Sequence, residues 1–357
     1  MKRICYLLLF VLAGCSGSKE NNAAKKEIPV SKNYITVLSP RQNDELTIGE
    51  NVFLQLSAND SIAFDSIVCF LNDKLLITEY GNNSNFIKKN ITLATDKTGT
   101  NTLKIISYFN NEHETDFVSL HLLSDIIPVN KKYTVINTYK HGTDSYTQGL
   151  VYKDGYIYEG TGNWGKSRIM KYKPDEHKIL NQVNLSSDYF GEGIEVIDDN
   201  IYQITWRSQK GFVYDKNTFE KTREFRYPYY EGWGLTYDGT NLLMTDGTNK
   251  VYFLDKNYFS EIKTIEVYDN NGPVKYLNEL EFVNGTLYAN VYQKNYIVGI
   301  NTNSGKVIEK IDLSDILPEK DKYENIDVLN GMAYNPEKNT WYITGKNWPV
   351  LFEIRVR

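Results

Sequence analysis

Residues 189–206, YFGEGIEVIDDNIYQITW, predict a β-hairpin. Two short apolar runs, 193–197 and 201–205, flank a turn of two aspartates and an asparagine. Because a hairpin returns the chain to its starting end, Glu192 and Trp206 are expected to lie close together on one rim. Glu192 stands between two glycines, which let other atoms approach closely. An acid held beside an indole in this way is suited to proton transfer.

Five segments of the chain share the pattern of this hairpin: a glycine-containing start, an apolar strand, a turn and a second strand. The other four are YTQGLVYKDGYIYEGTG from Tyr146, YEGWGLTYDGTNLLMTDG from Tyr230, LNELEFVNGTLYANVY from Leu277 and LNGMAYNPEKNTWYITGKNWP from Leu329. The repeats are spaced 44, 41, 46 and 51 positions apart at their anchor residues, which are Gly149, Gly193, Gly234, Leu280 and Gly331. Further strand-like runs lie between the anchors, at 168–172, 211–214, 251–254 and 297–300. A period of about 40–50 residues with four strands in each repeat is typical of a β-propeller.

Five repeats of this size fill residues 133–357, and the strand 133–139 is expected to close the ring beside 351–357. In a propeller the first strand of each blade lines the central channel. The residues just before the anchors are then expected to meet there, and these are Gln148, Glu192, Trp233, Glu279 and Asn330. The ends of the second strands are expected on the same rim, and these are Thr161, Trp206, Asp246, Tyr292 and Lys346. Such a polar and aromatic funnel is the first hypothesis for a binding site.

Polar residues in a propeller channel can also serve only to bond neighbouring blades and water, and this alternative stays open for each single residue. It explains the whole set less well, because Trp206, Trp233 and Tyr292 at a channel mouth would leave aromatic surface with no structural purpose. Asp246 and Glu281, beside turn and strand glycines, are expected to make structural bonds.

Composition limits the class of protein. The chain has 357 residues, enough for two folded units, and 41% of them are hydrophobic. The mean hydropathy of -0.46 is that of a soluble globular protein and not of a disordered or membrane-embedded one. A net charge of -5 without a long basic run argues against nucleic acid as a partner.

Residues 1–15, MKRICYLLLFVLAGC, are predicted to be a targeting segment with a basic start and a short apolar core. The ending LAGC resembles a bacterial lipobox, in which Cys15 would be acylated and become the mature N-terminus. An ordinary signal peptide cut elsewhere is the alternative. A lipid on Cys15 would anchor the protein to a membrane of the cell envelope, and we expect the outer membrane, at its periplasmic or surface face. Residues 16–32, rich in Ser, Asn, Lys and Glu, are predicted to be a flexible tether.

Residues 33–127 show a different pattern, of short alternating strands separated by turns. The predicted strands are 34–38, 51–56, 66–71, 86–91, 101–108 and 115–122. This number of strands in roughly ninety residues predicts a β-sandwich, and the segment resembles bacterial immunoglobulin-like domains at the level of the fold. It contains no catalytic constellation, which favours a spacer or an interaction module. Cys69 would be the lone unmodified cysteine of the mature chain, because Cys5 leaves with the signal peptide and Cys15 carries the lipid. It is expected to be a small buried hydrophobe and not a nucleophile.

The second unit also carries a family resemblance. The motifs YTQGL, FGEG, IYQITW, GWGLT, TDG, LNELE, NVY, DVLNGMAY and TGKNWPVLFEI, in this order, resemble the glutamine cyclotransferase family. This is the plant and bacterial type of glutaminyl-peptide cyclotransferase, a five-bladed β-propeller, and the resemblance covers residues 131–357. It implies an enzyme that converts the N-terminal glutamine of a peptide or protein into pyroglutamate and releases ammonia.

The resemblance also implies a set of site residues. Glu192 matches the catalytic glutamate of the family, and Lys346 is expected to assist it. The residues that would contact the substrate are Gln148, Trp206, Trp233, Asn278 and Phe190, together with two departures from the common pattern, Tyr146 for Phe and Tyr292 for Trp. These departures, with Asn347 and the YEGTG segment, put substrate preference in question more than reaction type.

The implied chemistry needs one carboxylate that acts first as a base and then as an acid, with a pKa raised towards the working pH. Indole walls would desolvate Glu192 and shift its pKa in that direction. Gln148 and Asn278 would orient the substrate amide, and Lys346 would hold the developing oxyanion or keep a carboxylate ionised. No metal or other cofactor is expected, because the four histidines show no ligand spacing.

Two other functions remain open on the residues alone. One is a non-enzymatic propeller that binds a peptide or glycan at the cell envelope, with the sandwich as its docking arm. The other is a lyase that acts on a different substrate in the same funnel.

Overall fold

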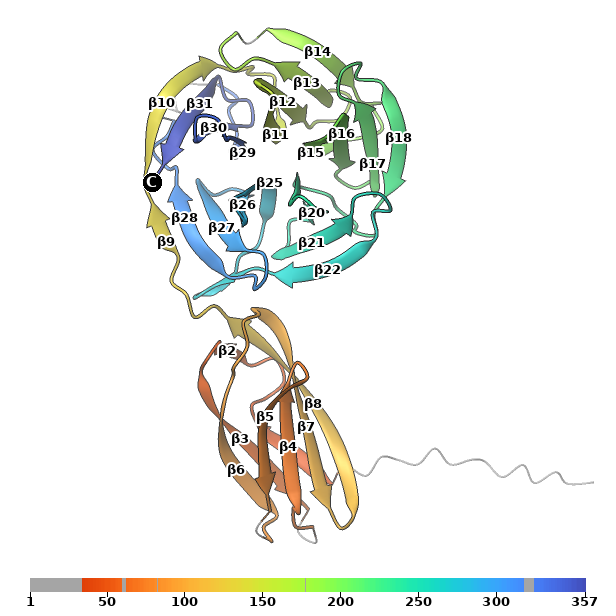
Figure 1. The fold of residues 1–357 in the computed structure, drawn as a ribbon, viewed down its shortest axis with the longest axis vertical. Helices are drawn as coiled ribbons and strands as arrows, with labels where there is room; N and C mark the ends of the chain where they lie inside the picture. The colour runs from red at the N-terminus through yellow and green to blue at the C-terminus, as the bar shows by residue number, and fades with distance from the viewer. Residues whose placement is uncertain (1–33, 60–61, 82, 177, 318–323) are drawn as a thin grey trace, which may run out of the picture.

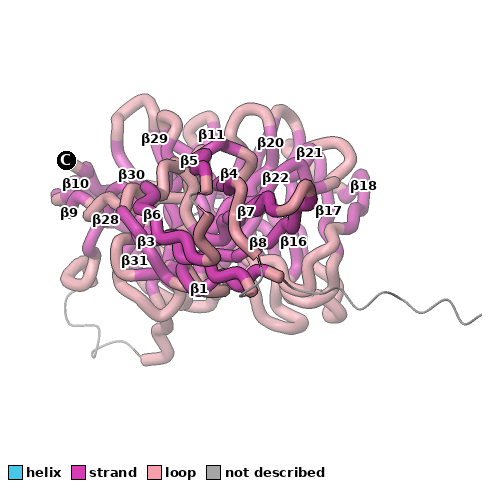
Figure 2. Tube along the Cα trace, turned by 90° about the horizontal axis from the view of Figure 1, so that it is seen from below, coloured by secondary structure: helices cyan, strands magenta, loops and turns pink. Residues whose placement is uncertain are grey.

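The computed structural model describes residues 34–59, 62–81, 83–176, 178–317 and 324–357. These residues form an all-β protein, and Figure 2 shows strands and loops without a helix in this part of the chain. Among them there is accordingly no helix long and apolar enough to cross a membrane. The predicted targeting segment, its Cys15 and the tether 16–32 lie outside the described residues.

The N-terminal unit consists of two sheets that face each other across one apolar core (Figure 1). The smaller sheet has the order β1-β3-β6, with the bounds Ile35–Ser39, Asn51–Ala58 and Phe86–Thr92. The larger has the order β2-β8-β7-β4-β5, with the bounds Glu45–Thr47, Glu112–Leu123, Gly99–Phe109, Ser66–Leu71 and Lys74–Tyr80. Alternating burial along β7 turns residues such as Leu103 and Ile105 into this core.

All six strands predicted in this unit are present, but β2 and β5 were not predicted. Strand β5 lies at the edge of its sheet and is mostly exposed, so its sequence lacks the apolar alternation of a half-buried strand. It follows β4 through Asn72 and Asp73, whose φ angles of 48° and 68° form a tight hairpin turn. Cys69 on β4 is buried, and burial raises the pKa of its thiol to about 12, as expected for a packing residue.

The C-terminal unit is a ring of sheets around a common centre (Figure 1). The described residues form five such sheets, each with its first strand innermost. The first has the order β11-β12-β13-β14, with the bounds Thr147–Lys153, Tyr156–Thr161, Arg168–Tyr172 and Ile179–Asn184. The second has the order β15-β16-β17-β18, with the bounds Gly191–Ile197, Asn200–Thr205, Lys210–Asp215 and Lys221–Arg226. The third has the order β19-β20-β21-β22, with the bounds Leu235–Tyr237, Asn241–Thr245, Lys250–Asp255 and Glu261–Glu266.

The last two sheets complete the ring and join it to the preceding chain. The fourth has the order β25-β26-β27-β28-β9, with the bounds Leu277–Val283, Thr286–Val291, Tyr296–Asn301, Val307–Asp312 and Val129–Lys131. The fifth has the order β29-β30-β31-β10, with the bounds Leu329–Asn335, Thr340–Gly345, Val350–Val356 and Tyr133–Lys140. The pairing of β10 with β31 is the closure predicted from the sequence, whereas the parallel pairing of β9 with β28 was not predicted. A small hairpin of β23 and β24 has the bounds Tyr268–Asp269 and Gly272–Pro273.

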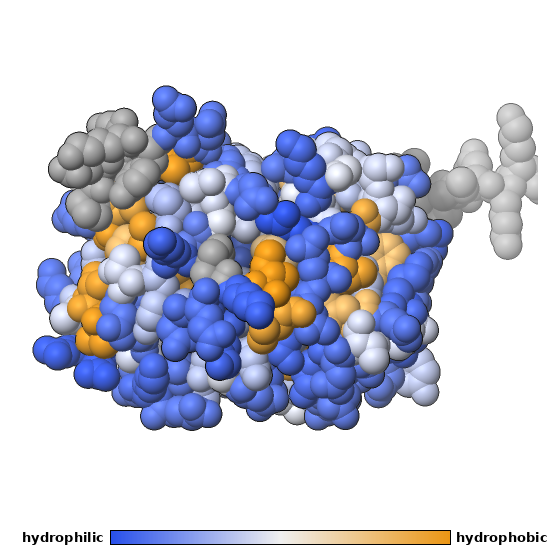
Figure 3. All heavy atoms as spheres, turned by 90° about the horizontal axis from the view of Figure 1, so that it is seen from above, coloured by the Kyte–Doolittle hydropathy of each residue, from blue (hydrophilic) through white to orange (hydrophobic). Residues whose placement is uncertain are grey.

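Apolar side chains fill the spaces between neighbouring sheets of the ring. Tyr158 of the first sheet packs in one cluster with Ile194 of the second, and Leu243 of the third packs with Leu280 of the fourth. On the face shown in Figure 3 the surface is mostly hydrophilic, with a few hydrophobic groups among the polar ones. Burial between the sheets therefore supplies the hydrophobic stabilisation of the ring.

At the repeated glycines, neighbouring inner strands lie too close together for a side chain to fit between them. A Cβ on Gly149 would lie 2.5 Å from the backbone nitrogen of Ile194, and one on Gly193 would lie 2.5 Å from that of Leu235. Gly193 instead donates a 2.8 Å backbone hydrogen bond to Trp233. The repeated glycine of the sequence motif is thus required by contact between neighbouring inner strands.

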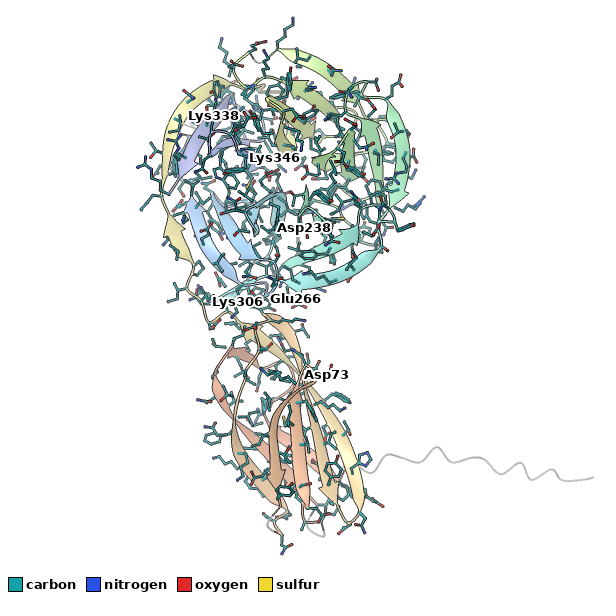
Figure 4. All side chains as sticks on the ribbon, in the orientation of Figure 1. Asp73, Asp238, Glu266, Lys306, Lys338 and Lys346 are labelled. Carbon is teal, nitrogen blue, oxygen red and sulfur yellow. The ribbon has the colours of Figure 1, made fainter. Side chains whose placement is uncertain are left out.

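The two units meet through polar contacts at the outer edge of the ring. The Thr98 hydroxyl donates to the Glu266 carbonyl at 2.6 Å, and the Thr100 amide donates to the Glu266 carboxylate at 3.1 Å. Lys306 pairs with Asp125 at 2.7 Å, and Figure 4 shows Glu266 and Lys306 at this junction.

A buried ion pair fixes the segment that follows the closing strand β10. The Nδ1 atom of His141 lies 2.7 Å from the Trp348 carbonyl, and its Nε2 lies 3.1 Å from the Glu159 carboxylate. Burial opposes a charged imidazole, but the Glu159 charge and these hydrogen bonds raise the pKa of His141 above its ordinary value. Through Glu159 and the Trp348 carbonyl, His141 connects the first sheet with the loop before β31.

Replacing His141 with Ala should lower the free energy of unfolding of the ring by about 3 kcal/mol, because it leaves the Glu159 charge buried without its partner. A group whose pKa is raised by folding contributes stability below its unfolded pKa and loses it as the pH rises through the folded pKa. The difference between wild type and variant should therefore shrink as the pH rises through the folded His141 pKa. Calorimetric unfolding over a pH series measures this, and His113→Ala, at an exposed position, should stay within about 0.5 kcal/mol of wild type. An equal change in both variants would contradict the prediction.

Candidate active site

A cavity of about 260 Å³ opens among the inner strands of the ring. The structure brings all nine predicted pocket residues together in its lining, and adds Asn163 to them. The lining residues are Tyr146, Gln148, Asn163, Phe190, Glu192, Trp206, Trp233, Asn278, Tyr292 and Lys346. Figure 4 shows Lys346 near the centre of the ring.

Backbone bulges aim several of these side chains. In β15 the pairing register shifts between Gly191 and Ile194, so Glu192 and Gly193 together oppose a single residue of β16. Register shifts occur at the matching place in β11, β25 and β29. A bulge bends its strand and redirects the side chain of the extra residue, and bulges are frequent next to active sites.

The register of these bulges corrects one prediction. Leu280 is equivalent to Ile194 and Met332, the first paired residues after their bulges, and not to Gly193. The anchor of the fourth repeat is therefore Glu279, and the residue before it, Asn278, lines the cavity. Glu279 was expected in the funnel, but its carboxylate instead accepts hydrogen bonds from two backbone amides of neighbouring inner strands, those of Leu150 and Met332, at 3.3 and 3.0 Å.

Glu192 is the buried acid of the site, with an exposed fraction of 5%. Its Oε1 accepts a 3.1 Å hydrogen bond from Nε2 of Gln148. The Gln148 side-chain oxygen in turn accepts one from Nδ2 of Asn330 at 3.3 Å. Gln148 is therefore held between the two residues and fixes the orientation of the carboxylate, in addition to lining the cavity.

The pKa of Glu192 is raised well above its ordinary value. Burial is the largest cause, because it disfavours the charged form. The positive charge of Lys346 opposes this shift, and the negative charge of Glu231 adds to it. The raised pKa agrees in direction with the shift expected from the sequence.

Asn278 and Lys346 line the same cavity, the first with a hydrogen-bond acceptor and the second with an amine. The Oδ1 atom of Asn278 is buried and accepts no hydrogen bond from the described residues. The Lys346 Nζ lies 4.6 Å from the ring centre of Tyr146 and 5.3 Å from that of Tyr292. Burial lowers the pKa of Lys346, while the charges of Glu192 and Asp327 raise it.

Aromatic rings form the walls. Trp233 meets Tyr292 edge to face with ring centres 5.6 Å apart, and Phe190 meets Trp206 at 5.5 Å. Tyr146 packs on Phe190 at 6.3 Å, and its hydroxyl donates to Asp327 at 2.9 Å. All these rings line the same cavity as Glu192.

Sequence reasoning missed Glu231 and Arg207, which support these walls. The Glu231 carboxylate accepts hydrogen bonds from Nε1 of Trp233 at 2.9 Å and from Nε of Arg207 at 2.8 Å. The Arg207 guanidinium lies 3.8 Å from the ring centre of Trp206. Both residues adjoin motifs that were recognised, since Arg207 follows Trp206 and Glu231 stands two positions before Trp233.

Two residues of the predicted rim, Asp246 and Thr161, and the inner-strand residue Glu281 make structural bonds. Asp246 accepts from the Thr248 amide and from the Tyr252 hydroxyl, and Glu281 accepts from the Tyr334 amide, as expected for both. Thr161 accepts from the Arg168 amide. In the part of the chain that the structure describes, no group of three or more His, Cys, Asp or Glu residues is placed to hold a metal ion.

The fold and the cavity define an all-β protein with a buried acid, a buried lysine and amide groups within aromatic walls. The sequence pattern of the family described as glutamine cyclotransferase matches residues 116–356. A glutaminyl-peptide cyclotransferase of Arabidopsis thaliana is 34% identical over 226 residues, which cover 62% of this chain and 71% of that protein. The crystal structure of Myxococcus xanthus glutaminyl cyclase superimposes with a TM-score of 0.60 at 30% identity, over 64% of this chain and 98% of that one. The chain belongs to the glutamine cyclotransferase family.

Replacing Glu231 with Gln should lower the pKa of Glu192, because it removes a nearby negative charge and leaves the Arg207 charge without its partner. The measurement is a carbon-13 NMR titration of the glutamate carboxyl groups, with the Glu192 signal assigned from Glu192→Gln. Glu337→Gln, at an exposed position on another sheet, should leave the titration unchanged. An unchanged or raised Glu192 pKa in Glu231→Gln would show that the two carboxylates are not coupled.

Proposed function

We propose that this cavity binds the N-terminal glutamine of a peptide or protein, with Glu192 as the general base and acid of the reaction. The chain is a glutaminyl-peptide cyclotransferase, which forms pyroglutamate and releases ammonia. The observation that carries the assignment of the site is the burial of one carboxylate with a raised pKa among aromatic walls and an unsatisfied amide oxygen.

The reaction begins with attack of the substrate α-amine on the side-chain carbonyl carbon of the same residue. A nitrogen–carbon bond forms, the carbonyl oxygen gains negative charge, and the amine must lose a proton. Glu192 in its carboxylate form takes this proton. Because both reacting groups belong to one residue, holding the ring-closing conformer supplies much of the rate enhancement.

The second half of the reaction breaks the bond between the carbonyl carbon and the amide nitrogen. Glu192, now protonated, returns its proton to this nitrogen, which leaves as ammonia. A carboxyl group with a pKa near the working pH can serve in both directions, which an ordinary exposed glutamate does poorly. The burial of Glu192 and its proximity to the Glu231 charge support this role.

The other polar groups have matching roles in this scheme. The free acceptor of Asn278 can receive a hydrogen bond from the substrate amide nitrogen, which orients the leaving group. The Lys346 ammonium can stabilise the negative charge that develops on the carbonyl oxygen. Gln148, already bonded to Glu192, keeps the carboxylate directed at the amine. Side chains supply the proton transfers and the charge stabilisation of this scheme, which requires no cofactor.

The finer description of the fold belongs to the same proposal. The ring of five sheets is built from four antiparallel strands in each sheet, with β9 added in parallel to the fourth, and is closed by β10; we interpret it as a five-bladed β-propeller. The two facing sheets of the N-terminal unit are interpreted as an immunoglobulin-like sandwich that serves as a spacer or interaction module. The propeller presents the acid from one blade to amide, aromatic and lysine side chains from the others.

Replacing Glu192 with Gln should lower ammonia release from peptides that begin with glutamine by about 10²–10⁴-fold, the usual contribution of a general base or acid. A coupled ammonia assay with Gln-initiated peptides of several lengths measures this, with near-UV circular dichroism to verify the fold. Glu220→Gln, at an exposed turn, is the matched control and should keep full activity. A wild-type protein inert towards every such peptide, or a fully active Glu192→Gln, would overturn the assignment.

The proposed location is the cell envelope, with a lipid on Cys15. If Cys15 is acylated, Cys15→Ser should move the protein from the membrane fraction to the soluble fraction and abolish incorporation of radiolabelled fatty acid. Cys5→Ser, within the same leader, should keep both the label and the membrane fraction. Membrane association that is unchanged in Cys15→Ser would contradict the anchor.

A further inference from the structure

We infer that Trp164 and Tyr230 bind the residue that follows the N-terminal glutamine, and that preferred substrates carry an aromatic or large apolar side chain there. This inference rests on the proposed function, because it takes the cavity as the site of the glutamine. It adds a second subsite, outside the cavity, and a class of preferred substrate.

The two residues end a continuous row of planar groups that contact one another edge to face, at a tilt or through the Arg207 guanidinium. Trp164 meets Phe190 edge to face with ring centres 5.8 Å apart, and Phe190 meets Trp206 at 5.5 Å. The Arg207 guanidinium lies 3.8 Å from the Trp206 ring and 5.9 Å from the Tyr230 ring. Phe190 and Trp206, in the middle of the row, also line the cavity.

Both ends of this row are open to solvent. Trp164 has an exposed fraction of 53% and lies in the loop between β12 and β13. Tyr230 has an exposed fraction of 68% and lies in the loop between β18 and β19. Exposed aromatic rings that continue the wall of a cavity are the pattern of a binding surface, because they offer apolar area at a low cost in side-chain entropy.

The small size of the cavity indicates that the second residue of the substrate lies outside it, on this row. Its volume of about 260 Å³ is below the roughly 300–1,000 Å³ typical of sites for drug-sized ligands. A terminal glutamine inside it would therefore leave the next residue of the peptide at the mouth. The charge of Arg207 is balanced there by its 2.8 Å pair with Glu231, so the row presents ring and guanidinium faces and no unpaired charge. An aromatic side chain can stack on such faces.

Tyr146, which packs on Phe190 of the row, leads to a part of the cavity lining that carries charge. Tyr146 uses its hydroxyl to bond Asp327, and the Lys346 ammonium lies beside the Tyr146 and Tyr292 rings. A large apolar residue after the glutamine avoids the Lys346 charge when it lies on the row from Trp164 to Tyr230, which favours that placement.

The test compares kcat/KM for Gln-Phe-Ala amide and Gln-Ala-Ala amide, measured by ammonia release. The wild-type protein should prefer the Phe peptide by about tenfold. Trp164→Ala and Tyr230→Ala should each reduce turnover of the Phe peptide by about fivefold to tenfold, and that of the Ala peptide by less than about twofold. Trp164→Phe, which keeps an aromatic face, should recover most of the preference.

Tyr258→Ala is the matched control, since Tyr258 is 83% exposed in the turn between β21 and β22, and it should change neither value. Equal losses for both peptides in Trp164→Ala would reveal a structural role through Phe190 and overturn the inference. Unchanged values in both loop variants, or a wild type without preference, would overturn it as well. These outcomes differ from failure of the proposed function, in which the wild-type protein would release ammonia from neither peptide.

Discussion

The close approach of neighbouring inner strands is the constraint on which the site depends. At Gly149 and Gly193 a single Cβ would collide with the backbone of the next inner strand, and a Cβ on Gly234 would lie 2.0 Å from the Asn278 carbonyl oxygen. Glycine at these positions lets each inner strand contact the next one directly, as in the hydrogen bond from Gly193 to Trp233. The residue before each glycine is then carried to the centre of the ring, where side chains from distant parts of the sequence share one small cavity.

That geometry also explains the electrostatics. A carboxylate at the centre of packed sheets loses its contact with water, which raises the pKa of Glu192, and the lysine and the second carboxylate nearby adjust the shift in opposite directions. Glu231 has two effects on the site. Its charge raises the pKa of Glu192, and its carboxylate also binds the Trp233 indole and the Arg207 guanidinium, which lies over the Trp206 ring. The shape of the cavity and the proton affinity of its acid therefore depend on one another.

The sequence predicted the ring sheets and the pocket residues well, because a period of about 40–50 residues and the glycine motif repeat clearly along the chain. Prediction from the sequence failed where the repeat is imperfect. It also failed for residues that only the folded chain brings to the site. Leu280 was predicted as the anchor of the fourth repeat, because that repeat has no glycine at its start. The bulge in β25 shows that Glu279 occupies the position that glycine has in the other repeats. The edge strands β5 and β9 bury little apolar surface, so no periodicity marked them. Asn163 and Glu231 are ordinary loop residues in the sequence, and the folding of the ring alone brings them to the cavity or to its walls.

The replacement of glycine by Glu279 shows how a repeated scaffold becomes an asymmetric site. Its buried carboxyl group accepts backbone hydrogen bonds from Leu150 and Met332, and so connects three inner strands at the point where a glycine would leave space. Asn278, the residue before it, is thereby held in the cavity with its amide oxygen unsatisfied, a condition that is costly unless a ligand supplies the missing donor. The acid and the amide thus come from the inner strands β15 and β25, and the lysine directly follows β30, so packing within the sheets determines their positions. Trp164 and Tyr230 come from exposed loops, which tolerate substitution without disturbing the core. A ring built in this way can change the peptides that it accepts while the groups around Glu192 stay fixed.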